Sequence, residues 1–312
     1  MSMNTFDFQK GQVYFRDRFV PFGDATLSIA SSPILYGLSV YTVFSVNWNE
    51  QEQKLYAFRL EDHYKRLVNS ANVMDFNSFA KEWTSEKFRK TMVDLVRKNN
   101  IQEDALVRTT VYIDEIAAGT KIHDLKNGLS AYVYPMGEIL PTSGTHLCVS
   151  SWVRNMDNSI PAKAKINGSY VNASLMKNEA LLNGYDDAIA LDHSGHVAES
   201  TVANLFIVRG NQLVTPDTST DILEGITRDT ILEISPKLGI NVQERSIDRT
   251  ELYKCEEAFL CGSSAKITPI LSIDRRKVGN GEIGPITKKL MKYYSQIQKG
   301  EIKDFAGWRL EI

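Results

Sequence analysis

The sequence predicts a two-domain α+β fold, and three observations support this prediction. At 312 residues the chain is long enough for two domains with substantial cores. Strand and helix signals alternate along it, interrupted by a Gly/Pro-punctuated stretch at residues 136–144. Strands joined by helices in one half and by hairpins in the other fit an α+β architecture. We therefore expect a small α/β domain at 1–135, an interdomain linker at 136–144 and a larger, β-rich domain at 145–312.

The first part of the chain contains five predicted strands and two predicted helices. Short runs rich in β-branched and aromatic residues favour strands, and longer runs of helix-forming residues favour helices. The strands are expected at 12–15, 27–29, 40–46, 106–113 and 129–134, and the helices at 61–72 and 79–98.

The second part is denser in strand signals. Strands are expected at 147–153, 188–191, 204–208, 240–242 and 258–260. Turn residues at 193–195 and 210–211 indicate antiparallel ribbons. Helices are expected at 171–182, from near Thr227 onward, and at 285–298. Pro236 should kink or shorten the middle helix, because proline lacks an N–H and clashes with the preceding turn.

Composition excludes several classes of function. The net charge is −2 and the basic residues are scattered, so no nucleic-acid footprint is present. No apolar run approaches the roughly 20 residues of a membrane span, and residues 1–7 lack the layout of a signal peptide. Three widely spaced cysteines, Cys148, Cys255 and Cys261, favour neither a disulfide framework nor a cysteine metal site. We expect a cytoplasmic protein that binds no metal.

Four segments carry the candidate chemistry: 165–170 (KINGSY), 196–206 (HVAESTVANLF), 223–229 (LEGITRD) and 261–269 (CGSSAKITP). In this order and at these separations they resemble the fold-type IV pyridoxal-phosphate (PLP) enzymes, and most closely the branched-chain amino-acid aminotransferases. The resemblance runs from about residue 14 to residue 308. It implies a two-domain fold like that of D-amino-acid aminotransferase, PLP as cofactor, and a homodimer or larger assembly whose active site is completed by a neighbouring subunit.

Two lysines, Lys163 and Lys165, are candidates for the amine that holds the aldehyde of such a cofactor. Spacing and composition cannot choose between them, and either could be a solvated lysine at a strand end. The resemblance favours Lys165, because the family's lysine precedes a Gly and a Tyr at the spacing of Gly168 and Tyr170. It implies that Lys165 forms a Schiff base with PLP and acts as the catalytic base of a ping-pong transamination.

An acid is needed beneath the ring nitrogen of PLP. A carboxylate there keeps the nitrogen protonated, so that the ring can accept the electrons of a Cα carbanion. By resemblance this residue is Glu199, and Asn204 completes the motif. By themselves, Glu199 would be interpreted as a surface turn residue and Asn204 as the start of a strand.

The phosphate group needs a cradle, which the sequence offers at a helix start. Gly225 permits close approach of the backbone, and the N–H groups of Ile226 and Thr227 then open a helix whose dipole favours an anion. Thr227 could equally be a helix N-cap. By resemblance, Ser263 contributes a second turn and Arg66 a bidentate contact. Arg66 alone would be an ordinary exposed helix residue.

The remaining site residues follow from the resemblance alone. Tyr170 matches the tyrosine that hydrogen-bonds the ring hydroxyl of the cofactor, and Leu223 matches an apolar residue on the ring face. The expected substrate-binding residues are Tyr36, Tyr41, Arg108, Ser263 and Ser264, with Arg108 binding the distal carboxylate of a dicarboxylate co-substrate. Tyrosines on strands are more often core residues. Trp152 and Cys261 are interpreted as structural.

The chain departs from the branched-chain pattern at one strand. Where the family reads Phe-Glu-Gly, this chain has Tyr41, Thr42 and Val43, which is closer to D-amino-acid transaminases. Leu106 also replaces an expected tyrosine. The chain lacks the arginine-x-histidine carboxylate trap of the D-specific enzymes, however, and it keeps Gly168.

We expect transfer of the amino group of leucine, isoleucine or valine to 2-oxoglutarate. The alternatives are a D-amino-acid or (R)-amine transaminase, an aminodeoxychorismate lyase-like enzyme, or a catalytically silent PLP-binding protein.

Overall fold

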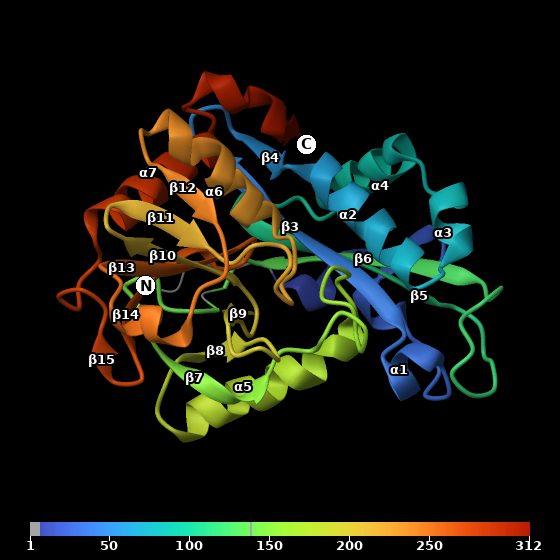
Figure 1. The fold of residues 1–312 in the computed structure, drawn as a ribbon. Coiled ribbons are helices and arrows are strands. Elements are labelled where there is room, and N and C mark those ends of the chain that lie inside the picture. Colours follow the sequence, from blue (N-terminus) through green and yellow to red (C-terminus); the bar gives the residue numbers. More distant parts are fainter. Residues whose placement is uncertain (1–6, 138) are drawn as a thin grey trace. The chain divides into compact units, whose positions relative to one another are not determined.

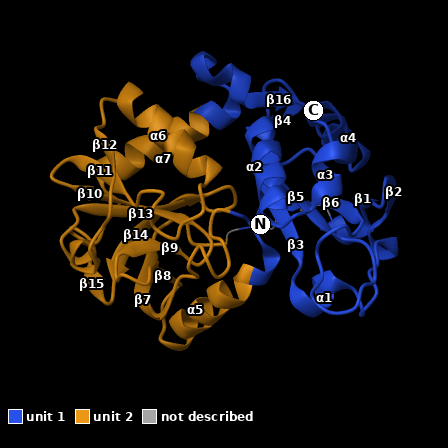
Figure 2. Ribbon diagram, turned by 45° about the vertical axis from the view of Figure 1, so that its right-hand side comes forward, with its two compact units in different colours: residues 1–137, 164–168, 297–312 blue, residues 138–163, 169–296 orange. Residues whose placement is uncertain are grey.

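A computed structural model describes residues 7–137 and 139–312 of the chain (Figure 1). Residues 1–6, on which most of the signal-peptide argument depends, lie outside the described residues, as does residue 138 of the expected linker. The chain divides into two compact units (Figure 2). Unit 1 comprises residues 1–137, 164–168 and 297–312, and unit 2 comprises residues 138–163 and 169–296.

Unit 1 is built on a seven-stranded sheet whose described strands pair antiparallel throughout. Across the sheet the order is β16 (Arg309–Glu311), β4 (Lys54–Phe58), β3 (Ser39–Asn49), β5 (Ala105–Ile113), β6 (Asn127–Pro135), β1 (Gln12–Phe15) and β2 (Arg18–Pro21). The first nine residues of β3 are all buried. This run fits its β-branched and aromatic sequence, because a strand covered on both faces need not alternate with polar residues.

Helices cover this sheet. They are α1 (Ser32–Tyr36), α2 (Leu60–Val73), α3 (Asn77–Glu82) and α4 (Ser85–Lys98), with short 3-10 turns η1 (Phe8–Lys10), η2 (Phe22–Asp24) and η5 (Lys303–Trp308). Helix α2 packs against β3. Its buried residues Leu60, His63, Leu67 and Ala71 recur every three or four positions, so they form one face of the helix.

Unit 2 contains a nine-stranded mixed sheet. The order is β12 (Val242–Glu244), β11 (Gln212–Thr215), β10 (Asn204–Arg209), β13 (Glu257–Gly262), β14 (Lys266–Ile273), β7 (Thr145–Val153), β8 (Asp187–Leu191) and β9 (Val197–Ser200), with β15 (Arg276–Lys277) beside β14. The parallel pairs are β11–β12, β14–β7 and β7–β8. The helical elements of unit 2 are α5 (Tyr170–Leu182), α6 (Ile226–Lys237), η4 (Arg249–Tyr253) and α7 (Pro285–Lys299), of which the last three residues belong to unit 1. The turn η3 (Asn167–Ser169) crosses the boundary, with residues 167–168 in unit 1.

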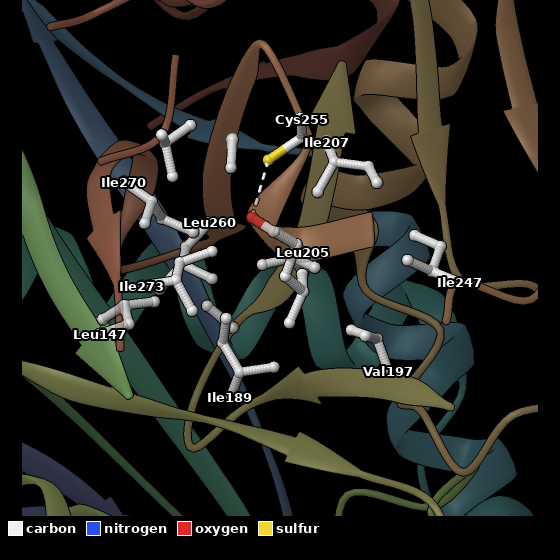
Figure 3. Close-up of a cluster of buried hydrophobic side chains, with 14 of the residues drawn as sticks. Leu147, Ile189, Val197, Leu205, Ile207, Ile247, Cys255, Leu260, Ile270 and Ile273 are labelled. Atoms are coloured by element: carbon white, nitrogen blue, oxygen red, sulfur yellow. Dashed lines mark hydrogen bonds between the residues drawn. The ribbon is translucent and has the colours of Figure 1, made fainter. Parts of the chain in front are cut away.

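The core of unit 2 is an aliphatic cluster contributed by several of these strands (Figure 3). Leu205, Leu260 and Ile273 are fully buried within it. The thiol of Cys255 also packs there and donates to the carbonyl of Leu252 at 3.3 Å. Burial raises the pKa of Cys255 to about 12, so this cysteine is a packing group rather than a nucleophile. All three cysteines are free and buried.

Most predicted elements are confirmed, and the α+β class is confirmed with them. The strand expected at 27–29 is wrong. Instead, the Ser28 carbonyl accepts from the Ser31 amide and the Ser28 hydroxyl accepts from the Ala30 amide, which makes a turn. Ile29 is largely exposed. As expected, Pro236 shortens its helix, because α6 ends at the next residue.

The helix expected at 79–98 is two helices in the structure. Trp83 takes an extended conformation between α3 and α4, and the hydroxyl of Thr84 accepts from the amide of Lys87 as the N-cap of α4. The indole of Trp83 is buried and packs edge-on against Tyr14. The burial of this large side chain, together with the new cap, outweighs continuation of a single helix.

The units differ from the expected domains in two stretches. Residues 164–168 belong to unit 1 because Val40 of β3 forms an antiparallel bridge with Ile166. Residues 297–312 also belong to unit 1, because β16 pairs with β4. Both stretches lie within the range expected for the large domain. Among the described residues, no helix is both long enough and apolar enough to cross a membrane.

Candidate active site

The expected site residues fall into two sets, one on each unit. On unit 1, the segment 164–168 is attached to β3 by backbone hydrogen bonds. The amide of Tyr41 donates to the carbonyl of Lys165 at 3.0 Å. The amide of Lys165 donates to Ser70 Oγ on α2, also at 3.0 Å. Two elements therefore fix the main chain of Lys165, and its side chain projects from a rigid base.

Two glycines allow this close approach. Gly37 follows α1 with φ of +69°, a left-handed conformation that favours glycine. A Cβ atom on Gly37 would lie 2.8 Å from Gly168 Cα, closer than non-bonded carbon atoms tolerate. Gly37 therefore lets the turn before β3 pack directly against the segment that carries Lys165.

The two candidate lysines have different surroundings. Lys163, on unit 2, directs its ammonium at the backbone carbonyls of Thr218 and Thr220. These contacts give the amine a structural role. The Nζ atom of Lys165 instead lies 4.8 Å from the centroid of the Tyr41 ring. The two lysines therefore lie on different units, Lys163 on unit 2 and Lys165 on unit 1.

Glu199 is buried on β9 of unit 2, and both of its carboxylate oxygens are hydrogen-bonded. Oε1 lies 2.7 Å from Nη2 of Arg154. Oε2 accepts from Asn204 Nδ2 at 2.9 Å and from the Leu223 amide at 3.3 Å. Three donors stabilise the anionic form and fix the orientation of the carboxylate. The alternative interpretation of Glu199 as a surface turn residue is wrong, because its side chain is only 6% exposed.

Arg154 is the residue that sequence reasoning missed. Its side chain is 11% exposed, and its main chain is anchored by the amide's hydrogen bond to the Leu191 carbonyl at 2.8 Å. An arginine just past the end of a strand is usually solvated, so the sequence around Arg154 gives no sign of its partner. Only the pairing of β7 with β8 and of β8 with β9 brings it to Glu199.

Helix α6 begins beside this carboxylate. Gly225 is its N-cap, without a side-chain cap, so the interpretation of Thr227 as an N-cap is wrong. The amides of Ile226 and Thr227, both buried, donate to no group in the described part of the chain. A Cβ on Gly225 would lie 2.0 Å from Asn204 Oδ1. Asn204 Nδ2 in turn donates to the Leu223 carbonyl at 2.8 Å, so the helix start and the Glu199 carboxylate share one amide.

Arg66 on α2 belongs to a polar cluster of unit 1. Its Nη2 donates to Thr42 Oγ1 at 3.2 Å, and that hydroxyl lies 2.8 Å from Nδ1 of His63. Burial and the nearby positive charges of Arg66, Arg59 and Lys165 hold the pKa of His63 well below its usual value. His63 is therefore neutral. The side chain of Thr42, at the departure from the family pattern, is directed at this cluster.

Arg108 on β5 is held by two contacts within unit 1. Its Cζ lies 3.7 Å from the centroid of the Tyr41 ring, and its Nη2 donates to Asn167 Oδ1 at 2.6 Å. Tyr36, at the end of α1, is 42% exposed.

The other expected residues lie on unit 2. Tyr170 opens α5, and Leu223 is half-buried before α6. Ser263 and Ser264 form the turn between β13 and β14. Cys261 is buried, whereas Trp152, interpreted as structural, is 46% exposed.

Comparison with known proteins identifies related sequences and structures. The family model described as "Amino-transferase class IV" matches residues 39–273. A protein of Aquifex aeolicus, named as a probable branched-chain-amino-acid aminotransferase, is 39% identical over 299 residues, covering 95% of this chain and 94% of its own. The branched-chain-amino-acid aminotransferase of Pseudomonas aeruginosa is 34% identical, with 96% of each chain covered.

Solved structures give the same result. The branched-chain aminotransferase of Thermoproteus uzoniensis with norvaline has a TM-score of 0.91 at 35% identity, covering 96% of this chain and 99% of its own. The branched-chain amino acid aminotransferase of Thermobaculum terrenum in its PLP form has a TM-score of 0.90 at 34% identity, covering 98% and 99%.

Proposed function

Because this chain belongs to the class IV amino-transferases, we propose that it moves the amino group of leucine, isoleucine or valine to 2-oxoglutarate. The family and structural matches confirm the expected fold-type IV, PLP-dependent aminotransferase. One observation carries the choice of amino donor: similarity of 39% over almost the whole chain to a relative named for branched-chain amino acids. The geometry of the two units supports the roles proposed below.

The donor groups of the chain fit PLP. The amine of Lys165 suits its aldehyde and the fixed anion of Glu199 suits its ring nitrogen. The amides that open α6 suit its phosphate, since Gly225 leaves that helix start bare and a Cβ there would collide with Asn204. When bound, PLP supplies an aldehyde that exchanges amino groups and a ring that accepts electrons.

We assign covalent attachment and proton transfer to Lys165. Nζ of Lys165 would hold the aldehyde of PLP, and the same amine, once free, would act as the base for the Cα proton of the amino acid. Its main chain is fixed by hydrogen bonds to Tyr41 and Ser70, so both roles would start from one defined backbone position. Release of a 2-oxo acid and reaction with 2-oxoglutarate complete a ping-pong cycle.

Glu199 is assigned to the protonated ring nitrogen. Arg154 and Asn204 fix the orientation of the carboxylate, so it could accept a hydrogen bond from the ring N–H without reorganising. For the phosphate we assign the amides of Ile226 and Thr227, together with Arg66 and Ser263. Tyr170 is assigned to the ring hydroxyl and Leu223 to the ring face.

Substrate contacts are assigned to Tyr36, Tyr41, Ser264 and Arg108, with Ser263 shared with the phosphate. Arg108 would bind the distal carboxylate of 2-oxoglutarate, because a guanidinium matches a carboxylate with two parallel hydrogen bonds. Leucine has no such carboxylate, so it would occupy the same pocket without using this arginine.

A panel of initial rates tests this function. The purified enzyme with 2-oxoglutarate should convert L-leucine faster than D-alanine or (R)-1-phenylethylamine. Absence of turnover with L-leucine would overturn the choice of donor. Borohydride reduction followed by peptide mapping should label Lys165. The variant Lys163→Ala should keep the label, whereas Lys165→Ala should lose it.

A second candidate is a D-amino-acid or (R)-amine transaminase. The observation that favours it is Val43, whose side chain on β3 is bulkier than the glycine of the branched-chain pattern. Faster conversion of D-alanine than of L-leucine in the same panel would select it.

We further propose a cytoplasmic homodimer or larger homo-oligomer, as the resemblance to the family implies. Large apolar side chains are exposed on both units, including Ile29 and Ile34 on unit 1 and Val171 and Leu182 on unit 2, and a second subunit would cover such side chains if they form a continuous patch. Light scattering on the purified protein should give a mass of at least two monomers, and a monomer would contradict the assembly.

A further inference from the structure

We propose that Asn167 is a positioning residue for Arg108 and so sets the preference for a dicarboxylate acceptor over a branched-chain 2-oxo acid. This inference rests on the role proposed above for Arg108. It concerns a residue outside the expected site, in the segment that carries Lys165.

Asn167 holds Arg108 through a short chain of side-chain hydrogen bonds. Arg108 Nη2 donates to Asn167 Oδ1 at 2.6 Å, and Asn167 Nδ2 donates to Ser39 Oγ at 2.7 Å. Arginine can only donate, so the amide oxygen must face it and the amide nitrogen must face the hydroxyl. The orientation of the Asn167 side chain is therefore fixed at both ends.

A second contact fixes the plane of the guanidinium. Arg108 pairs with Val43 across β3 and β5, and Tyr41 is two residues from Val43 on the same face of β3. The Arg108 Cζ lies 3.7 Å from the Tyr41 ring centroid, a stacking distance for a cation on an aromatic face. Stacking defines the plane, and the hydrogen bond to Asn167 defines the rotation within that plane.

The partner of Arg108 is neutral, which matters for its function. A carboxylate partner would cancel the charge that an anionic substrate needs, whereas an amide oxygen leaves it intact. Only one of the five guanidinium donors is used by a side chain or carbonyl in the described part of the chain. The remaining donors are free for a substrate carboxylate, and the ordering of a flexible side chain has been completed before binding.

The main chain of Asn167 is itself held in place. It follows Ile166, which bridges to Val40, and precedes Gly168, which packs against Gly37. This rigid base also supports Lys165. If Asn167 had a purely structural role, its substitution would therefore slow the reaction with every substrate equally. A positioning role would slow only the reaction with the dicarboxylate acceptor, and this difference makes the proposal testable.

The test compares two acceptors in the second half-reaction of the holoenzyme. The amine form of Asn167→Ala should react with 2-oxoglutarate about three- to tenfold less efficiently, the size expected when one arginine must be ordered on binding. Its reaction with 4-methyl-2-oxopentanoate should be unchanged. Asn167→Asp should lose more of its catalytic efficiency with 2-oxoglutarate than Asn167→Ala does, because the new carboxylate neutralises the charge of Arg108. In the PLP form, Asn167→Ala should bind glutarate more weakly than the parent does and should bind 4-methylvalerate with unchanged affinity.

The control variant is Asn172→Ala, which removes a half-buried asparagine on α5 whose Nδ2 donates to the Val153 carbonyl, and it should match the parent in its preference between the two acceptors. Arg108→Met should lose selectivity for 2-oxoglutarate, and adding Asn167→Ala to it should change nothing further. Equal losses for both acceptors in Asn167→Ala, or a further loss in the double variant, would overturn the positioning role. If Arg108→Met alone leaves 2-oxoglutarate unaffected, the proposed role of Arg108 fails, and this inference fails with it.

Discussion

Substitution of Gly225 by alanine should destabilise the protein and weaken PLP binding, because the added Cβ atom displaces a neighbouring side chain. The backbone of Gly225, with φ of −74° and ψ of 134°, is open to alanine, so the substitution introduces no backbone strain. The added Cβ would, however, lie 2.0 Å from Asn204 Oδ1. The amide of Asn204 must move, and it then loses its hydrogen bonds to Glu199 and to the Leu223 carbonyl.

The cost follows from these two hydrogen bonds. A bond to a charged group contributes about 1.5–3 kcal/mol and a neutral one about 0.5–1.5 kcal/mol. Their loss should lower the free energy of unfolding of the apoenzyme by about 2–4.5 kcal/mol. Binding of PLP should weaken as well, because Glu199 loses one of its three donors and the start of α6 is displaced.

Urea unfolding of the apoenzyme measures the first effect, since without cofactor the measured stability has no contribution from ligand binding. The matched control is Gly23→Ala, whose Cβ would meet nothing within 4 Å and which should change stability by less than about 0.5 kcal/mol. In the background of Asn204→Ala, where the clashing amide is absent, Gly225→Ala should cost little more.

Two results would refute this reasoning. Unchanged stability of Gly225→Ala would show that the helix start accommodates the methyl group. An undiminished loss in the Asn204→Ala background would place the cost elsewhere than in the Asn204 amide.

Two further predictions concern other buried polar groups. Thr42→Val removes the hydroxyl between Arg66 and His63, so the apoenzyme should bind PLP about three- to tenfold more weakly. The affinity for pyridoxal, which lacks the phosphate, should not change. An equal loss of affinity for both compounds would contradict the prediction. Burial raises the pKa of Asp187 above its usual 3.8, so the native state binds this proton more tightly than the unfolded chain does, and stability is lost as pH rises through the raised pKa. In Asp187→Asn the amide oxygen can keep the 2.6 Å hydrogen bond from Thr201. This variant should therefore be more stable than the parent at about pH 8, and its gain in stability should be smallest at about pH 4. An equal difference in urea midpoint at both pH values would exclude this cause.

Local signals account for the parts of the fold that the sequence predicts well. The strand expected at 12–15 has those bounds in the structure, and the helix expected at 285–298 is longer by one residue. The helix expected near Thr227 begins at Ile226, with Gly225 as its N-cap, a position at which glycine is among the favoured residues. The strand prediction from composition failed at 27–29, where the side chain of Ser28 competes for backbone hydrogen bonds.

Long-range contacts account for what sequence reasoning missed. Arg154 and Glu199 are separated by several elements of secondary structure, and no pattern around either residue encodes their ion pair. Likewise, the membership of residues 164–168 in unit 1 depends on a bridge between Val40 and Ile166. The motif allows Lys165 to be proposed from the sequence, but it does not predict the hydrogen bonds that hold the main chain of this residue.

The passage of the chain between the two units has a consequence for synthesis on the ribosome. The edge strand β16 of unit 1 comprises residues 309–311, and the segment that carries Lys165 is made only after β7 of unit 2. Domains usually fold as units during translation, with the N-terminal one first. Here the N-terminal unit must wait for residues made long after it, so β4 emerges with an unpaired edge. In that state the nascent chain exposes a strand edge that can pair with another chain.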